Sequence, residues 1–223
     1  MRAIKPYTIV ASLLSLGVAA CATVSSSPVA SEASSEAYAK SSSTKGVVIL
    51  AVNWSRRWNC GGYENAEIMS LGFDRLPMKD STNDSSPEVF IDGPPRLTKK
   101  PIFLDYALLL DPGEYALTSF DIKVARSVSD VGHFVAKRSH LIENGKPKAG
   151  SFEVKAGETV YIGNFFLDCH QQPIIWRYYT EGRDGFRAHM SEVKQKYPFI
   201  EPDRVTYRLF RTTTLGQDYQ LPK

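Results

Sequence analysis

The 223-residue chain has few of the residues that catalytic and metal sites commonly use. It contains four histidines and three cysteines, and they are scattered, with no His-x-His or Cys-x-x-Cys spacing of the kind that metal sites favour. It also lacks a Gly-x-Ser-x-Gly nucleophile turn, a glycine-rich phosphate loop and a dinucleotide-binding fingerprint. We therefore predict no catalytic residue, no metal ion and no cofactor.

An excess of charge of one sign is also absent. The formal net charge is +3, and removal of Arg2 and Lys5 with an export signal would lower it by two, to +1. This balance argues against nucleic acid as a partner, because nucleic-acid-binding domains carry a strong basic excess. Beyond the first 20 residues, no apolar run reaches the roughly 20 residues that a membrane-spanning helix needs.

The beginning of the chain has the three parts of an export signal. Arg2 and Lys5 form a short positive region, residues 7–18 are mostly apolar, and Ala19 and Ala20 are small residues at the expected cleavage position. The apolar region is too short to span a bilayer. Residues 1–20 are therefore predicted to be a signal peptide.

The sequence Val18-Ala19-Ala20-Cys21 resembles the lipobox of bacterial lipoproteins, although Val stands where that family usually has Leu. The resemblance implies a diacylglycerol thioether on Cys21, cleavage before it and acylation of the new amino group, typically by palmitate. Two or more acyl chains hold a protein stably on a membrane, whereas one holds it only marginally. Ala22 in place of Asp implies an outer-membrane destination, facing the periplasm. The alternative is a plain secretory signal in which Cys21 is incidental.

Residues 21–45 are predicted to be the lipidated cysteine and a flexible tether. This stretch is rich in Ser and Ala and has few large apolar residues, so it is not expected to form a core. A flexible chain of this length has an end-to-end distance of roughly 25–30 Å. Residues 46–223 are predicted to form one domain, because a chain of that length can bury a sizeable core.

With Cys21 lipidated, Cys60 and Cys169 remain as an even pair. In an oxidising periplasm such a pair is expected to form a disulfide. The alternative is two separate buried thiols.

The predicted domain is mainly β, an antiparallel β-sandwich of about eight or nine strands with one C-terminal α-helix. Residues 47–52 form a β-branched apolar run typical of a strand buried on both faces. Turn sequences at 111–114, 143–146 and 156–158 predict three hairpins. Apolar residues at 186, 190, 193 and 197 recur at helical spacing, which predicts a helix over residues 185–197.

Two segments carry a second resemblance. Residues 109–117 contain Pro-Gly-Glu-Tyr after an apolar strand, and residues 152–163 contain Ala-Gly-Glu between two strands, the second ending in Tyr-Ile-Gly. Together they resemble transthyretin-like (prealbumin-like) sandwiches of bacterial lipoproteins with no assigned function. The resemblance implies a fold class and brings no catalytic residues.

The best candidate for a recognition surface is the loop with Trp54, Arg56, Arg57 and Trp58. Tryptophan and arginine are the residue types enriched at binding hot spots. The alternative is that both tryptophans pack over the edge of the core while the arginines extend into solvent.

Two functions remain open at this point. The first is a membrane-anchored envelope module that binds, without catalysis, an envelope protein or peptidoglycan. The second is a periplasmic hydrolase whose site is assembled only in three dimensions.

Overall fold

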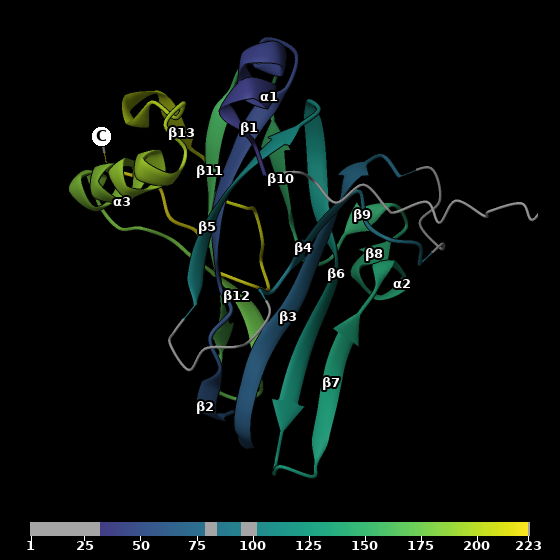
Figure 1. Ribbon diagram of the computed structural model, residues 1–223. Helices are drawn as coiled ribbons and strands as arrows, with labels where there is room; N and C mark the ends of the chain where they lie inside the picture. Colours follow the sequence, from purple (N-terminus) through teal and green to yellow (C-terminus); the bar gives the residue numbers. More distant parts are fainter. Residues whose placement is uncertain (1–31, 79–83, 95–101, 223) are drawn as a thin grey trace, which may run out of the picture.

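A computed structural model describes residues 32–78, 84–94 and 102–222, so that Cys21 and the predicted signal peptide lie outside the described residues. Two β-sheets pack face to face, and a helix covers the outer side of one of them (Figure 1). The mainly β class and the C-terminal helix predicted from the sequence are confirmed, with thirteen strands in the described residues rather than eight or nine.

The first sheet, sheet A, is mixed rather than wholly antiparallel. Its strand order is β12-β11-β1-β5, and β13 pairs with β11 beside β12. β1 runs parallel to β11, and so does β13, while the other pairs are antiparallel. The strands of sheet A are β1 (Gly46–Asn53), β5 (Phe103–Leu110), β11 (Thr159–Asp168), β12 (Ile174–Tyr178) and β13 (Val205–Tyr207).

Sheet B is antiparallel throughout and contains the two longest strands of the described chain. Its order is β10-β6-β3-β2, with β4 paired to β3 and β7 paired to β6. Its strands are β2 (Arg57–Cys60), β3 (Tyr63–Leu76), β4 (Val89–Asp92), β6 (Gly113–Ala125), β7 (Val131–Ala136) and β10 (Ser151–Val154). The long strands β3 and β6 extend with β7 to a narrow end of the molecule, opposite α1 (Ser35–Ser41) (Figure 1).

Strand β1 is buried on both faces, as its apolar sequence predicts. Val48, Leu50 and Val52 point into the core between the two sheets. Val47 and Ile49 point outward and pack beneath α3 (Arg183–Lys196), which explains why the strand has no polar face. The predicted helix positions are also confirmed, since Phe186, Met190, Val193 and Tyr197 are all buried in this second cluster.

The remaining short elements are α2 (Arg138–Leu141), the hairpin of β8 (Ile142–Glu143) with β9 (Lys146–Pro147), and a 3-10 helix over Pro202–Arg204. The turn of this hairpin is Asn144-Gly145, and both residues have positive φ, 51° and 72°. Two consecutive residues in that region define the tight turn that the Asn-Gly sequence predicts.

The other two predicted hairpins are wrong. β5 belongs to sheet A and β6 to sheet B, so the turn at residues 111–112 crosses between the sheets instead of joining paired strands. The turn at 155–158 likewise joins β10 of sheet B to β11 of sheet A. Turn residues predict a reversal of the chain, but the partner of each strand depends on contacts that are distant in sequence.

The predicted flexible tether also needs correction over residues 32–45. Ser34 caps α1 through its Oγ, which accepts a hydrogen bond of 3.1 Å from the backbone N–H of Ala37. Ala33 is buried, and its N–H donates to the carbonyl of Ala107 on β5 at 2.7 Å. The ring of Tyr38 stacks on Phe199 at 4.7 Å. The folded part therefore begins before residue 46. The Ser-rich composition does not reveal this start, because one of its serines caps a helix.

Candidate functional site

The predicted recognition loop is divided by the fold. Trp54 is fully buried, and its indole N–H donates a 2.8 Å hydrogen bond to the hydroxyl of Tyr106. It is a core residue and must be removed from the candidate surface. Trp58 lies on β2 and is 60% exposed, which makes it the most exposed aromatic residue in the described chain.

The two arginines of the loop lie differently. Arg56 extends over Trp58, with its guanidinium carbon 5.8 Å from the ring centroid. Arg57 is exposed and pairs in register with Ala66, whereas Trp58 pairs with Asn65. Because neighbouring residues of a strand point to opposite faces, Arg57 lies on the other side of the sheet from Trp58. Only Arg56 and Trp58 remain together.

Trp58 belongs to a larger surface on the outer side of sheet B at the narrow end. In register, Trp58 lies opposite Asn65 on β3, Asn65 opposite Ala125 on β6, and Ala125 opposite Val131 on β7. We call this surface the β2–β7 face. It consists of Arg56, just before β2, and of residues that alternate along the four strands: Trp58, Asn65, Glu67, Asp121, Lys123, Ala125, Val131, His133 and Val135.

A row of alternating charges crosses the β2–β7 face beside Trp58. Glu67 is only 1% exposed, although it lies on the outer face, because cations cover it from both sides. The Nε of Arg56 donates to its carboxylate at 3.1 Å, and the Nζ of Lys123 lies 3.6 Å from the same group. Between β7 and β6, the Nδ1 of His133 is 2.8 Å from a carboxylate oxygen of Asp121. These contacts hold the polar side chains in fixed positions and so preorganise the surface.

Sequence reasoning missed Glu67, Asp121, Lys123 and His133. Each occupies an outward position of an alternating strand, but the pattern alone does not say which strands are neighbours. The register brings them together from parts of the chain 11 to 77 residues away from Arg56.

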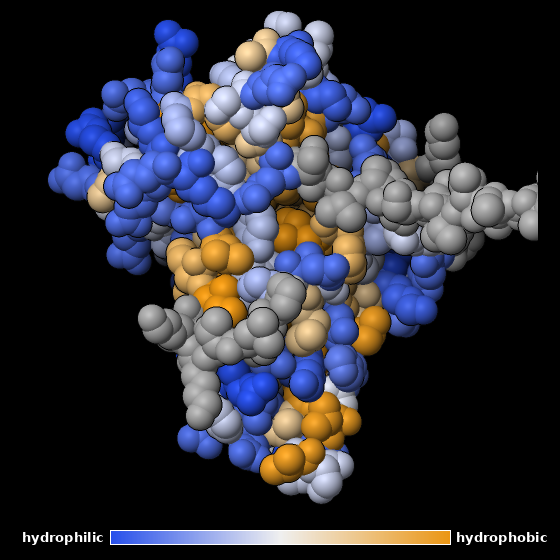
Figure 2. All heavy atoms as spheres, in the orientation of Figure 1, coloured by the Kyte–Doolittle hydropathy of each residue, from blue (hydrophilic) through white to orange (hydrophobic). Residues whose placement is uncertain are grey.

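Apolar side chains border this surface at the narrow end. Figure 2 shows hydrophobic residues gathered there, over β6 and β7. Val128, in the turn between these strands, is 98% exposed, and Val131 and Val135 of β7 are 48% and 51% exposed. An exposed apolar group bordered by polar residues is typical of an interaction surface rather than of a small-molecule pocket.

The predicted disulfide is present. Cys60, at the end of β2, is bonded to Cys169, which follows β11, across a sequence separation of 109 residues. In the chain-entropy treatment, closing a loop of about 100 residues stabilises the fold by roughly 4–5 kcal/mol. The bond ties the strand that carries Trp58 to sheet A.

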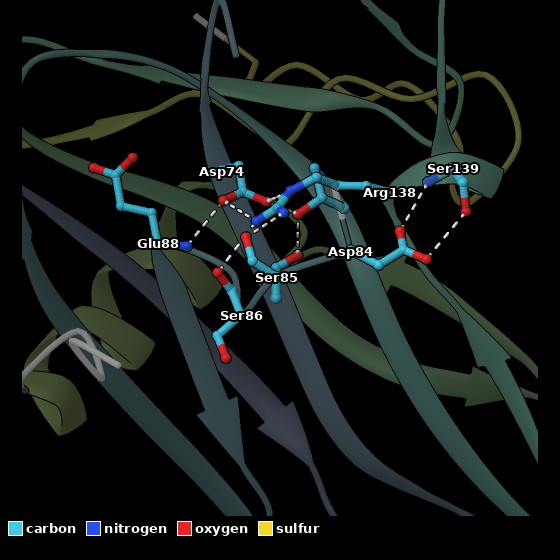
Figure 3. Close-up of polar contacts among 9 residues, drawn as sticks. Asp74, Asp84, Ser85, Ser86, Glu88, Arg138 and Ser139 are labelled. Carbon is cyan, nitrogen blue, oxygen red and sulfur yellow. Dashed lines mark hydrogen bonds and ion pairs between the residues drawn. The ribbon is translucent and has the colours of Figure 1, made fainter. Parts of the chain in front are cut away.

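A buried ion pair lies on the same sheet, away from the β2–β7 face. Asp74 of β3 and Arg138 of α2 form a two-fold hydrogen-bonded contact, with the Nε and Nη2 of Arg138 at 2.8 and 2.9 Å from the two carboxylate oxygens (Figure 3). Asp74 also accepts from the hydroxyl of Thr118 and from the backbone N–H of Glu88. Arg138 reaches the hydroxyl of Ser85 at 3.0 Å. The pair joins β3, β6, α2 and the segment before β4. Its role is therefore structural.

One acid–imidazole–hydroxyl chain bears on the hydrolase alternative. The Nε2 of His189 on α3 is 2.9 Å from Asp105 on β5, and its Nδ1 is 3.2 Å from the Oγ1 of Thr180. The Thr180 hydroxyl also lies 3.3 Å from the hydroxyl of Tyr161, which is fully buried. Burial raises the pKa of Tyr161 to about 12. These contacts link α3 to sheet A, and the Thr180 hydroxyl lies between His189 and Tyr161.

In the described residues, no group of three or more His, Cys, Asp or Glu side chains is placed to hold a metal ion. Among the same residues, no helix is both long enough and apolar enough to cross a bilayer. Comparison of the chain with protein-family models, with curated proteins and with solved structures finds no match in any of the three.

Proposed function

We propose that this protein is a bacterial envelope lipoprotein, anchored by lipid on Cys21 at the periplasmic side of the outer membrane, whose folded domain binds a partner through the β2–β7 face. The anchor is supported by the apolar region before Val18-Ala19-Ala20-Cys21. The Cys60–Cys169 disulfide fits the same location, because disulfides persist in oxidising compartments.

The short segment between Cys21 and the folded domain limits the distance of the domain from the membrane. Residues 22–31 are ten residues, and ten residues span at most roughly 35 Å even when fully extended. The domain therefore works close to the bilayer surface, where another envelope protein or peptidoglycan is within reach.

The observation that carries the binding proposal is the exposed Trp58 ring beside the row of paired charges on the β2–β7 face. A tryptophan that is 60% exposed has no role in the core, and Arg56 and Glu67 fix its surroundings. Tryptophan and arginine are enriched among the few residues that supply most of the binding energy at protein interfaces. A protein partner or a glycan strand lying across the sheet suits this face better than a small molecule, which needs a concave site.

Two substitutions of exposed aromatic residues test the binding face. Trp58→Ala should abolish capture of partners from detergent-solubilised envelope by the full protein, while Tyr178→Ala, which removes a 38% exposed aromatic residue from sheet A, should leave capture unchanged. An identical partner set for the wild type and for Trp58→Ala would contradict the proposal. Cys21→Ser tests the anchor separately, since it should move the protein from the detergent phase to the aqueous phase.

The hydrolase alternative is favoured by one observation, the Asp105–His189–Thr180 chain. It ranks second because the Thr180 hydroxyl is shared with Tyr161, and because none of the three residues lines the cavity of about 490 Å³ that residues 207–211 and 218–221 form. His189→Ala discriminates between the two functions. Loss of an ester-hydrolysing activity would support an enzyme, whereas faster proteolysis of α3 with no activity in either protein would support a docking role.

A further inference from the structure

Strand β7 is an edge strand with an unusually apolar exposed surface. Within the described part of the chain its ladder partner is β6 alone, and its other edge faces outward (Figure 1). Val131, Phe134 and Val135 are between 36% and 51% exposed. Proteins commonly protect such edges with charges, prolines or bulges, because unpaired backbone groups recruit another strand.

The hydrogen-bond pattern shows which backbone groups of β7 point away from β6. The N–H of Arg126 donates to the carbonyl of Asp130 at 2.9 Å, which makes this a hydrogen-bonded pair at the end of the ladder. In an antiparallel ladder such pairs alternate with non-bonded pairs. The in-register β6–β7 pairing therefore turns the N–H and C=O groups of Val131, His133 and Val135 away from β6.

We propose that β7 pairs antiparallel with β7 of a second copy of this chain, about a two-fold axis through His133. This register unites all three sets of outward groups: His133 with His133 of the other copy, and Val131 with Val135 in both directions. It gives about six backbone hydrogen bonds. A shift by two residues leaves neither valine of each copy opposite another valine.

The side chains of β7 are self-complementary in this register. On the outer face Val131 of each copy meets Val135 of the other. On the opposite face Phe134 meets Gly132, and an aromatic ring beside a strand glycine is a stabilising cross-strand pair. His133 is held by Asp121 of its own copy at 2.8 Å, so the two central imidazoles do not need each other as partners.

The contact joins the two B sheets edge to edge and places the two β2–β7 faces on one continuous surface. It does not depend on the lipid anchor or on the binding of another partner. An edge contact of five residues is smaller than the roughly 1,000 Å² of a stable interface, so the dimer is weak and is best detected by covalent trapping.

The test uses the full chain purified in detergent with a cysteine at the axis. In His133→Cys the two new cysteines lie opposite each other at a Cα separation of about 5.5 Å, within disulfide range. Val135→Cys is the control: its cysteine lies on the same strand, but the two cysteines of a dimer are separated by roughly 14 Å. Oxidation should give a dimer at least five times more abundant for His133→Cys, and equal yields, or no dimer from either, would overturn the proposal.

A second pair of variants distinguishes strand pairing from random collision. Val135→Lys in the His133→Cys protein places a charge against Val131 of the other copy and should lower the dimer yield at least ten-fold. Val128→Lys makes the same change at a 98% exposed valine outside the register and should leave the yield unchanged. Both sites are exposed, so both proteins should fold, and equal yields from the two would refute the register.

Discussion

Replacing Arg138 with methionine should destabilise the domain strongly, although the residue is far from the proposed binding face. The substitution keeps most of the side-chain volume but removes both hydrogen bonds to Asp74 and the one to Ser85. The two side chains of the ion pair are only 8% and 9% exposed, so the Asp74 carboxylate stays buried without its cation. Breaking a buried pair in this way costs about 3–5 kcal/mol.

The effect is measured by urea denaturation followed by tryptophan fluorescence. At a slope of about 2–3 kcal/mol per molar, the loss corresponds to a midpoint lower by roughly 1–2 M. Arg75→Met is the matched control, because Arg75 neighbours Asp74 on β3 but is exposed. It should change the free energy of unfolding by less than about 0.5 kcal/mol. Asp74→Leu combined with Arg138→Met should be more stable than Arg138→Met alone, since no charge is then left unpaired. Equal midpoints for Arg138→Met and Arg75→Met would refute the reasoning.

Two further predictions concern the other links between distant segments. Burial raises the pKa of Glu32, but hydrogen bonds from Lys196 and Tyr197 outweigh it and hold the pKa below its ordinary value of 4.5. Glu32 therefore stabilises the fold above about pH 4.5, and this contribution is lost as the pH falls through the lowered pKa. Glu32→Gln should cost roughly 0.5–1 kcal/mol of unfolding free energy at pH 7, because the ion pair is half-exposed, and the difference should shrink as the pH falls through the lowered pKa of Glu32. A pH-independent difference would show that the carboxylate charge is not the cause. Replacing Cys60 and Cys169 together by alanine should lower the unfolding free energy by about 2–5 kcal/mol and leave secondary structure unchanged in circular dichroism. Two free thiols in the unfolded, unreduced wild type would contradict the bonded pair.

Much of the fold could be predicted from local patterns. The apolar run of β1, the Asn144-Gly145 turn and the spacing of apolar residues on α3 each specify one element, and all three elements are present. Strand pairing could not be predicted in the same way. The turn after Asp111 has the residues of a hairpin, yet it crosses between sheets, because β6 pairs with β3, β7 and β10 instead of β5.

The candidate surface was predictable only in part, for the same reason. Trp54 and Trp58 have similar sequence surroundings, and only the packing of Trp54 against Tyr106 separates the core residue from the exposed one. Glu67 meets Arg56 and Lys123 only through the register of neighbouring strands, which no local pattern contains. The polar composition of the segment before β1 predicts a tether, whereas the docking of this segment depends on contacts to β5 and α3.

The most direct test of the proposed function is the mass of the amino-terminal peptide of the protein isolated from the membrane of a bacterial host with lipoprotein-processing enzymes. The proposal predicts a peptide that begins at Cys21 and carries diacylglycerol on its sulfur, with an acyl chain on its amino group and without residues 1–20. A peptide that begins at another residue, or one in which Cys21 carries no lipid, would contradict it.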